Sequence, residues 1–289
     1  MGENEVTVRF HGVRGSTACH GHATQRYGGN TSCVSIDFGE ESPIIFDLGT
    51  GLRYISLSED ESAVAKPFVG TCLLTHLHWD HLQGLPFFKP LLNPDTVIDI
   101  YGPRQSDGVS LQDAFMSKIC PPTFPIHLSD FLATINFHEI GDDDFMIGET
   151  RVMSRFVPHT GLTLGFRVTT NTTTVTYLSD HQQPAGDFAL TAGARQLCQN
   201  TDLLIHDSQF TPAEFATKSN WGHSTLEFAM WVAETTSAKR LALFHHDPSR
   251  RDDDLDVIAG RLAGIGQNRG FQVFAAADEM SVKVSAVVS

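Results

Sequence analysis

The segment that most restricts the fold of this chain is residues 75–81, with the sequence THLHWDH. It follows an apolar stretch, residues 71–74, that is typical of a buried strand. In extended backbone His76 and His78 project to the same side, while Asp80 and His81 can reach a second position where the chain turns. Three imidazoles and one carboxylate so close together predict two adjacent metal ions. The alternative is a polar loop whose histidines are incidental.

Short apolar segments separated by Gly-rich or polar turns indicate a β-rich first part of the chain. The expected strands are residues 6–10, 32–38, 44–47, 72–75, 97–101, 151–157, 164–168 and 175–178, with a short helix near 111–118. Helices then alternate with strands, which favours sheets covered by helices on their outer faces. Because no repeat, low-complexity segment or long linker is evident, we expect one domain over residues 1–289.

Two later helices have recognisable start signals. Ser224 and Glu227 have the spacing of a capping box before an apolar helical stripe. The last helix begins in the acidic run 252–254, whose negative charge suits a helix N-terminus, and it continues to Ile265. We interpret that acidic run as a helix start and nothing more.

Charge and cysteine content restrict the partners and the compartment. The formal net charge of −14 opposes the phosphate neutralisation on which binding of long nucleic acids depends, so we expect a small substrate. Five scattered cysteines favour a reduced setting over a disulfide framework. With neither a secretory apolar stretch nor a membrane-spanning run, a cytoplasmic location without membrane contact is expected.

The THLHWDH segment resembles the metal-binding signature of the metallo-β-lactamase superfamily. The remaining family positions follow in order at His159, Asp180 and His245, each next to an apolar run. The resemblance implies an α/β fold of the four-layer αββα sandwich type. It also implies that one ion is held by His76, His78 and His159, that the other is held by Asp80, His81 and His245, and that Asp180 bridges both. His246 is the alternative to His245.

The ligand set contains only nitrogen and oxygen donors, which suits two divalent ions, with Zn²⁺ preferred and Mn²⁺ possible. Two such ions can acidify a shared water and polarise a phosphoryl oxygen, so we expect attack by a metal-bound hydroxide. Asp80 is predicted to be a catalytic residue as well as a ligand.

A second pair of segments resembles the transfer-RNA-processing branch of the superfamily, tRNase Z. These are WGHST at 221–225 and LLIHDS at 203–208. The resemblance implies that His223 is the general acid that protonates the leaving oxygen and that Asp207 orients it and favours its charged form. A helix N-terminus beside His223 also suits a bound phosphate. The alternatives are a surface histidine at a helix entry and an ordinary strand-end carboxylate.

Three N-terminal segments, at 10–16, 26–33 and 47–51, resemble a bacterial branch of the superfamily, as does GLPFF at 84–88. In total the resemblance spans roughly residues 6 to 256. Asp47 is a candidate partner for a ligating histidine. Arg14 is either an ion-pair residue of the core or a substrate contact. The Gly28-Gly29-Asn30 turn is either structural or part of the site.

The full set of residues favours a two-metal phosphodiester hydrolase that cleaves small cyclic nucleotides. The chain has no long basic or Gly-rich insertion like the arm with which tRNase Z grips its substrate, and it is acidic overall. The alternatives are a lactone or carboxylic-ester hydrolase, an RNA-processing nuclease, or a metal-stabilised protein without catalysis. Homodimers are common among such relatives, so a homodimer is a further expectation.

Overall fold

The computed structural model describes residues 5–39, 42–55, 66–106, 108–170 and 172–285. Within these ranges the strands form two seven-stranded sheets. The first sheet has the order β14-β1-β2-β3-β4-β5-β6, with β1 (Glu5–Gly12), β2 (Cys33–Asp37), β3 (Ile44–Phe46), β4 (Val69–Leu73), β5 (Val97–Pro103), β6 (Thr134–Ile140) and β14 (Ser281–Ser285). The second has the order β13-β12-β11-β10-β9-β8-β7, with β7 (Asp143–Ile147), β8 (Thr150–Val157), β9 (Thr163–Thr169), β10 (Thr174–Leu178), β11 (Leu203–Asp207), β12 (Arg240–Phe244) and β13 (Gln272–Ala275).

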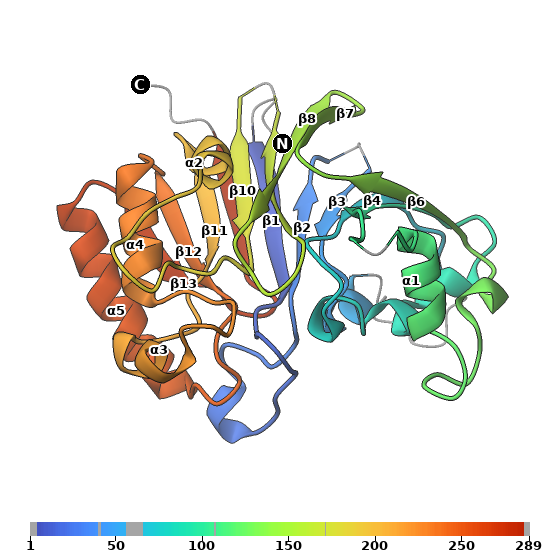
Figure 1. Ribbon diagram of the computed structural model, residues 1–289, viewed down its shortest axis with the longest axis horizontal. Coiled ribbons are helices and arrows are strands. Elements are labelled where there is room, and N and C mark those ends of the chain that lie inside the picture. Colours follow the sequence, from blue (N-terminus) through green and yellow to red (C-terminus); the bar gives the residue numbers. More distant parts are fainter. Residues whose placement is uncertain (1–4, 40–41, 56–65, 107, 171, 286–289) are drawn as a thin grey trace.

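Helices cover the outer faces of both sheets (Figure 1). They are α1 (Leu111–Lys118) on the first sheet and α2 (Ala192–Cys198), α3 (Pro212–Lys218), α4 (Leu226–Thr235) and α5 (Asp252–Asn268) on the side of the second. Three apolar cores separate the layers. Phe10, Phe46 and Phe166 pack between the sheets, Phe115 of α1 packs in the core of the first sheet's outer face, and Phe228 of α4 packs in that of the second. The predicted four-layer αββα sandwich is therefore confirmed.

All eight strands expected from the sequence are present, with shifted ends in two important places. β3 ends at Phe46 and β4 at Leu73, so Asp47 and Thr75 lie outside the strands that were expected to contain them. Asp47 has a left-handed backbone, with φ of 58°, which is incompatible with continuing a strand. Among the strands of the described residues, the ranges of β6, β7 and β11 to β14 were not predicted, although in β6 Ile135 and Phe137 alternate and pack on the core below α1.

The start of α4 corrects one detail of the sequence interpretation. The N-cap is Thr225, not Ser224, because the Thr225 hydroxyl accepts the Phe228 N–H. Ser224 instead donates its hydroxyl hydrogen to the carbonyl of His181. Two adjacent residues were suited to capping, and only the tertiary contact distinguishes them.

The acidic run does begin α5, but it does more than start a helix. Asp252 is buried and accepts the backbone N–H groups of Arg26 and Tyr27. Asp253 and Asp256 form ion pairs with the Arg26 side chain. The run therefore also attaches the N-terminal loop to the helical layer. Among the described residues, no helix is both long and apolar enough to cross a bilayer.

Candidate metal centre

The predicted site residues meet at one edge of the two sheets. Strands β8, β10, β11 and β12 point the same way, because β9 is antiparallel to β8 and β10 while β10, β11 and β12 are parallel. Their carboxyl ends therefore lie at one edge, as expected for sites in α/β sheets. The segment that follows β4 carries His76, His78, Asp80 and His81, while His159 follows β8, Asp180 follows β10, Asp207 ends β11 and His245 follows β12.

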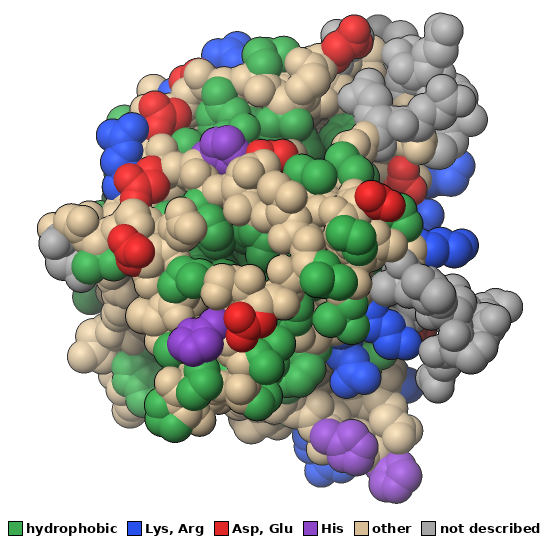
Figure 2. Space-filling view, turned by 90° about the vertical axis from the view of Figure 1, so that its right-hand side faces the viewer, with side chains coloured by type: hydrophobic (Ala, Val, Ile, Leu, Met, Phe, Trp, Pro, Cys, Tyr) green, Lys and Arg blue, Asp and Glu red, His purple; other side chains and the backbone are tan. Residues whose placement is uncertain are grey.

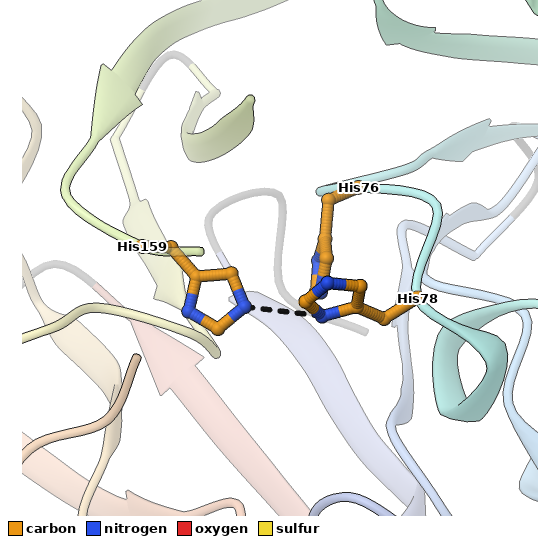
Figure 3. Close-up of side chains that lie close together, drawn as sticks. All are labelled: His76, His78 and His159. Atoms are coloured by element: carbon orange, nitrogen blue, oxygen red, sulfur yellow. Dashed lines mark hydrogen bonds between the residues drawn. The ribbon is translucent and has the colours of Figure 1, made fainter. Parts of the chain in front are cut away.

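A first group consists of His76, His78 and His159 (Figure 3). The Nε2 atom of His159 lies 3.2 Å from Nδ1 of His78. The His76 ring centroid is 4.3 Å from that of His78 and 4.8 Å from that of His159. The three rings thus converge as the sequence predicted for one ion.

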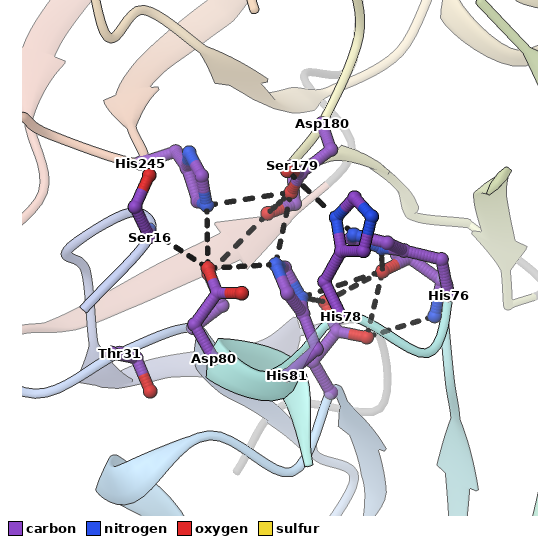
Figure 4. Close-up of polar contacts among 12 residues, drawn as sticks. Ser16, Thr31, His76, His78, Asp80, His81, Ser179, Asp180 and His245 are labelled. Carbon is purple, nitrogen blue, oxygen red and sulfur yellow. Dashed lines mark hydrogen bonds and ion pairs between the residues drawn. The ribbon is translucent and has the colours of Figure 1, made fainter. Parts of the chain in front are cut away.

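A second group consists of Asp80, His81 and His245 (Figure 4). Asp80 Oδ2 is 3.3 Å from His81 Nε2 and 3.5 Å from His245 Nε2. His246, the alternative to His245, is directed elsewhere, with its Nε2 atom 2.9 Å from the carbonyl oxygen of Ala276. Only His245 of this pair faces the cluster.

Asp180 lies between the two groups and directs a different oxygen to each. Its Oδ1 is 3.9 Å from His76 Nε2 and 3.6 Å from His159 Nε2. Its Oδ2 is 3.2 Å from His81 Nε2 and 3.4 Å from His245 Nε2. This is the placement expected of a carboxylate that bridges two ions.

The chemistry of the cluster fits divalent cations. The Nε2 atoms of His76, His81 and His245 are buried without a hydrogen-bond partner, an arrangement that is costly unless another group satisfies them. Burial holds the pKa of His76 well below its usual value, so its imidazole is neutral. Burial also disfavours the charged form of Asp180, but the neighbouring histidines outweigh it and hold its pKa well below the usual value. Neutral imidazole and carboxylate are the forms that ligate metals.

Four of the candidate ligand histidines are held in place through Nδ1, the ring nitrogen that faces away from the cluster. The partners are the Thr75 hydroxyl for His76 at 2.9 Å, Asp47 for His81 at 2.8 Å, the Gly222 carbonyl for His159 at 2.7 Å, and the Gln209 amide oxygen for His245 at 2.9 Å. These contacts orient each ring and direct Nε2 into the cluster. Asp47 is fully buried and also accepts the Tyr177 hydroxyl. Thr75 and Gly222 lie inside the THLHWDH and WGHST segments but had been given no role, and Gln209 lies outside the segments that carry the resemblance.

The N-terminal loop touches the cluster at two residues that the sequence did not single out as site residues. The Ser16 N–H donates to Asp80 Oδ2 at 2.8 Å. Gly15 packs so closely on His245 that an added Cβ would lie 2.4 Å from its Nδ1 atom. Ser16 and His245 both have left-handed backbones, with φ of 61° and 59°. Such strain at a non-glycine residue is typical of functional sites.

We expect Gly15→Ala to weaken metal binding by Asp80 and His245 more than it destabilises the fold. The methyl group would displace the His245 ring and break its bond to Gln209, and loss of such an orienting partner weakens metal affinity by about 10–100-fold. Metal content after dialysis measures the effect, with Gly186→Ala as the control, because that glycine, like Gly15, lies outside the left-handed φ region and has open space around its Cβ position. Equal metal loss in both variants would contradict the prediction.

His223 and Asp207 also meet, beside the second group. His223 Nδ1 lies 2.8 Å from Asp207 Oδ2 and 3.8 Å from Asp180 Oδ1. Asp207 is fully buried, and its Oδ1 accepts the N–H groups of Gln209 and Ser224. Burial lowers the pKa of His223, but Asp207 and Asp180 outweigh this and raise it. The pair therefore places an oriented imidazole with a raised pKa at the edge of the cluster.

Arg14 is a core residue, not a substrate contact. Its side chain is fully buried, and it donates to the carbonyls of Gly28, Asp247 and Arg250. Its Nη2 lies 3.8 Å from Asp252. The Gly28-Gly29-Asn30 turn serves the same core, because Asp278 accepts the N–H groups of Gly29 and Asn30, and a Cβ on Gly28 would overlap its carboxylate.

Adding Zn²⁺ to metal-free protein should raise its melting temperature by several degrees. An ion at a hundred times its dissociation constant stabilises the native state by about 2.7 kcal/mol, and each kcal/mol shifts the midpoint of a chain of this size by roughly 2–4 °C. Differential scanning calorimetry measures the shift. His81→Ala should largely abolish it, whereas His138→Gln, on the half-exposed pair with Asp99, should not. An unchanged midpoint on addition of Zn²⁺ would contradict a metal centre here.

Comparison with known proteins agrees with this geometry. Residues 59–246 match the family model described as the beta-lactamase superfamily domain. A ribonuclease Z of Streptococcus pneumoniae is 26% identical over 268 residues, covering 78% of this chain and 85% of the relative. The crystal structure of human tRNase Z, short form, has a TM-score of 0.65 at 22% identity and covers 96% of this chain and 98% of its own. A structure entitled a new diphosphatase from the PhnP family has a TM-score of 0.68 at 15% identity, covering 98% of this chain and 100% of its own.

Proposed function

Because the chain belongs to the beta-lactamase superfamily, we propose that it is a metal-dependent phosphodiester hydrolase whose substrate is a small cyclic nucleotide. The observation that carries the proposal is the buried pair of His223 and Asp207 beside Asp180. A ribose alkoxide must be protonated as it leaves, and the pair supplies an oriented imidazole for this step.

The proposed ligands divide into the two groups described above. In this proposal His76, His78 and His159 would hold one ion, Asp80, His81 and His245 would hold the other, and Asp180 would serve both, with Zn²⁺ preferred and Mn²⁺ possible. When bound, such ions supply Lewis acidity, which polarises a phosphoryl oxygen and acidifies water.

His223 serves in this proposal as the proton donor to the leaving oxygen. Its Nδ1 atom is engaged by Asp207, so Nε2 is the ring atom left for the substrate. The raised pKa keeps its proton available near neutral pH. Asp80 Oδ2 accepts the Ser16 N–H and faces Nε2 of His81 and His245. Burial disfavours the charged form of Asp80, but the neighbouring histidines outweigh it and hold its pKa far below the usual range, so the catalytic part of Asp80 would be to hold, as a carboxylate, the ion that activates water.

Charge supports a small substrate over a long nucleic acid. The chain has a formal net charge of −14. On the face shown in Figure 2, Lys and Arg side chains lie mainly along the edges and form no continuous stripe. Long nucleic acids are bound through many basic contacts to phosphates. A second candidate, an RNA-processing nuclease, is favoured by the similarity to ribonuclease Z relatives.

A substrate panel tests the proposal. Purified protein is assayed with 2′,3′- and 3′,5′-cyclic nucleotides, a precursor transfer RNA and an acylated lactone, beside His223→Ala and the control His138→Gln. We expect turnover of a cyclic nucleotide that depends on His223 and not on His138. Cleavage of the precursor RNA alone would favour the nuclease, and lactone turnover without any phosphodiester turnover would refute the proposal.

A further inference from the structure

A cavity of about 600 Å³ lies next to the candidate metal centre and contains none of its ligands. Cavity and cluster share the short helix η3 (Trp79–His81). Trp79 lines the cavity, while the next two residues, Asp80 and His81, are buried in the cluster. A molecule in this cavity is therefore separated from the cluster by a single turn of backbone. The volume of the cavity is in the range of small-molecule sites, roughly 300–1,000 Å³.

Aromatic side chains from four separate segments line the cavity: Tyr54, Trp79, Phe87 and Phe124. Three of them are exposed, at 44% for Tyr54, 53% for Trp79 and 62% for Phe87. Phe87 and Phe124 meet edge to face at 5.8 Å, which fixes both rings. Single exposed apolar residues are ordinary, but several aromatic rings gathered in one cavity mark a binding surface.

The wall of the cavity lacks the acidic side chains that are frequent in this chain, as far as the described residues show. Although the sequence contains 34 Asp and Glu residues, the described residues that line the cavity include neither. The lining does include Arg53, whose guanidinium carbon lies 5.2 Å from the centroid of the Tyr54 ring. Gln83 adds an amide to the wall. Flat aromatic faces, one cation and an amide suit a planar heterocycle that carries phosphate, and they suit an aliphatic chain less well.

We propose that this cavity binds the nucleobase of the substrate, with the base stacked on Trp79 and Phe87 closing the opposite side. The inference rests on the proposed phosphodiester hydrolase function only for the statement that the bound nucleotide is the substrate. Trp79 and Phe87 are then specificity residues, and Trp79 places the base next to the helix that carries Asp80. Because every base has a π-face, stacking favours nucleotides over sugar phosphates and discriminates weakly among bases.

Calorimetric titration with 5′-nucleoside monophosphates and with ribose 5-phosphate, which lacks a base, tests the proposal. We expect the nucleotides to bind more tightly than the sugar phosphate. Trp79→Ala should weaken nucleotide binding by roughly tenfold or more and leave ribose 5-phosphate unchanged. Trp79→Phe should retain most of the affinity. Phe87→Ala should also weaken nucleotide binding. Because Phe87, unlike Trp79, is not adjacent in sequence to a proposed metal ligand, this variant separates loss of stacking from disturbance of the metal centre.

Leu92→Ala is the matched control, since Leu92 is 59% exposed and does not line the cavity. Equal affinity for nucleotides and ribose 5-phosphate would overturn the proposal, as would a preference for an acylated lactone that is lost in Trp79→Ala. The two proposals fail separately. Base-dependent binding without any phosphodiester turnover would refute only the proposed function, and cyclic-nucleotide turnover without base-dependent binding would refute only the base site.

Discussion

Replacing His223 with alanine is expected to lower kcat for a cyclic nucleotide by about 10²–10⁴-fold, while hydrolysis of bis(p-nitrophenyl) phosphate falls far less. The reason is the leaving group. A ribose alkoxide needs the proton that His223 would donate from Nε2 while Asp207 engages Nδ1, whereas nitrophenolate leaves as a stable anion. Steady-state rates with the two substrates measure the difference.

Metal content and Asp207→Asn are the controls for this prediction. Metal content should stay at the wild-type level, because His223 is not among the proposed ligands. In Asp207→Asn the bond to Nδ1 of His223 can persist while the charge that raises its pKa is lost, so we expect an intermediate loss with the same dependence on leaving group. An equal loss for both substrates in His223→Ala would mean that the residue acts through site structure and not as an acid.

Replacing Arg14 with methionine should destabilise the native state by about 3–5 kcal/mol, the usual cost of removing one partner of a buried ion pair. Methionine fills much of the volume but leaves Asp252 without its buried cation and the carbonyls of Gly28 and Arg250 without their donor. Urea unfolding followed by fluorescence measures the loss.

Arg14→Met combined with Asp252→Asn shows whether the pair itself is responsible. If it is, the double variant loses less stability than the sum of the two single variants, because the second substitution removes the unpaired charge. A loss below about 1 kcal/mol in Arg14→Met would place it among ordinary surface substitutions and contradict the core role.

The positions that were predictable from the sequence are those with a strong local signal. The THLHWDH segment combines an apolar strand with alternating histidines, and His159, Asp180 and His245 each stand at the end of a similar apolar run. Local alternation indicated the first four residues, whereas the later three and the division into two groups were implied by the resemblance to the metallo-β-lactamase superfamily.

The contacts that escaped prediction depend on tertiary structure. Gln209 orients His245, and the Ser16 amide reaches Asp80 from a loop far away in the sequence. Gln209 lies outside the segments that carry the resemblance, and Ser16 ends one of them without a role that the sequence could assign. Arg14 could not be assigned for the same reason, since its partners Asp247, Arg250 and Asp252 lie at the other end of the chain.

The two sheets contribute different ligands. His76, His78, Asp80 and His81 follow a strand of the first sheet, whereas His159, Asp180 and His245 follow strands of the second. An ion held by Asp180 and His81 would cross-link the two halves of the sandwich at their shared edge. Separating the sheets and releasing the ion then become one event, so the ion would slow sub-global opening. Amide hydrogens of β4 and β10, deep in the sandwich, would exchange more slowly even though they touch no ligand atom.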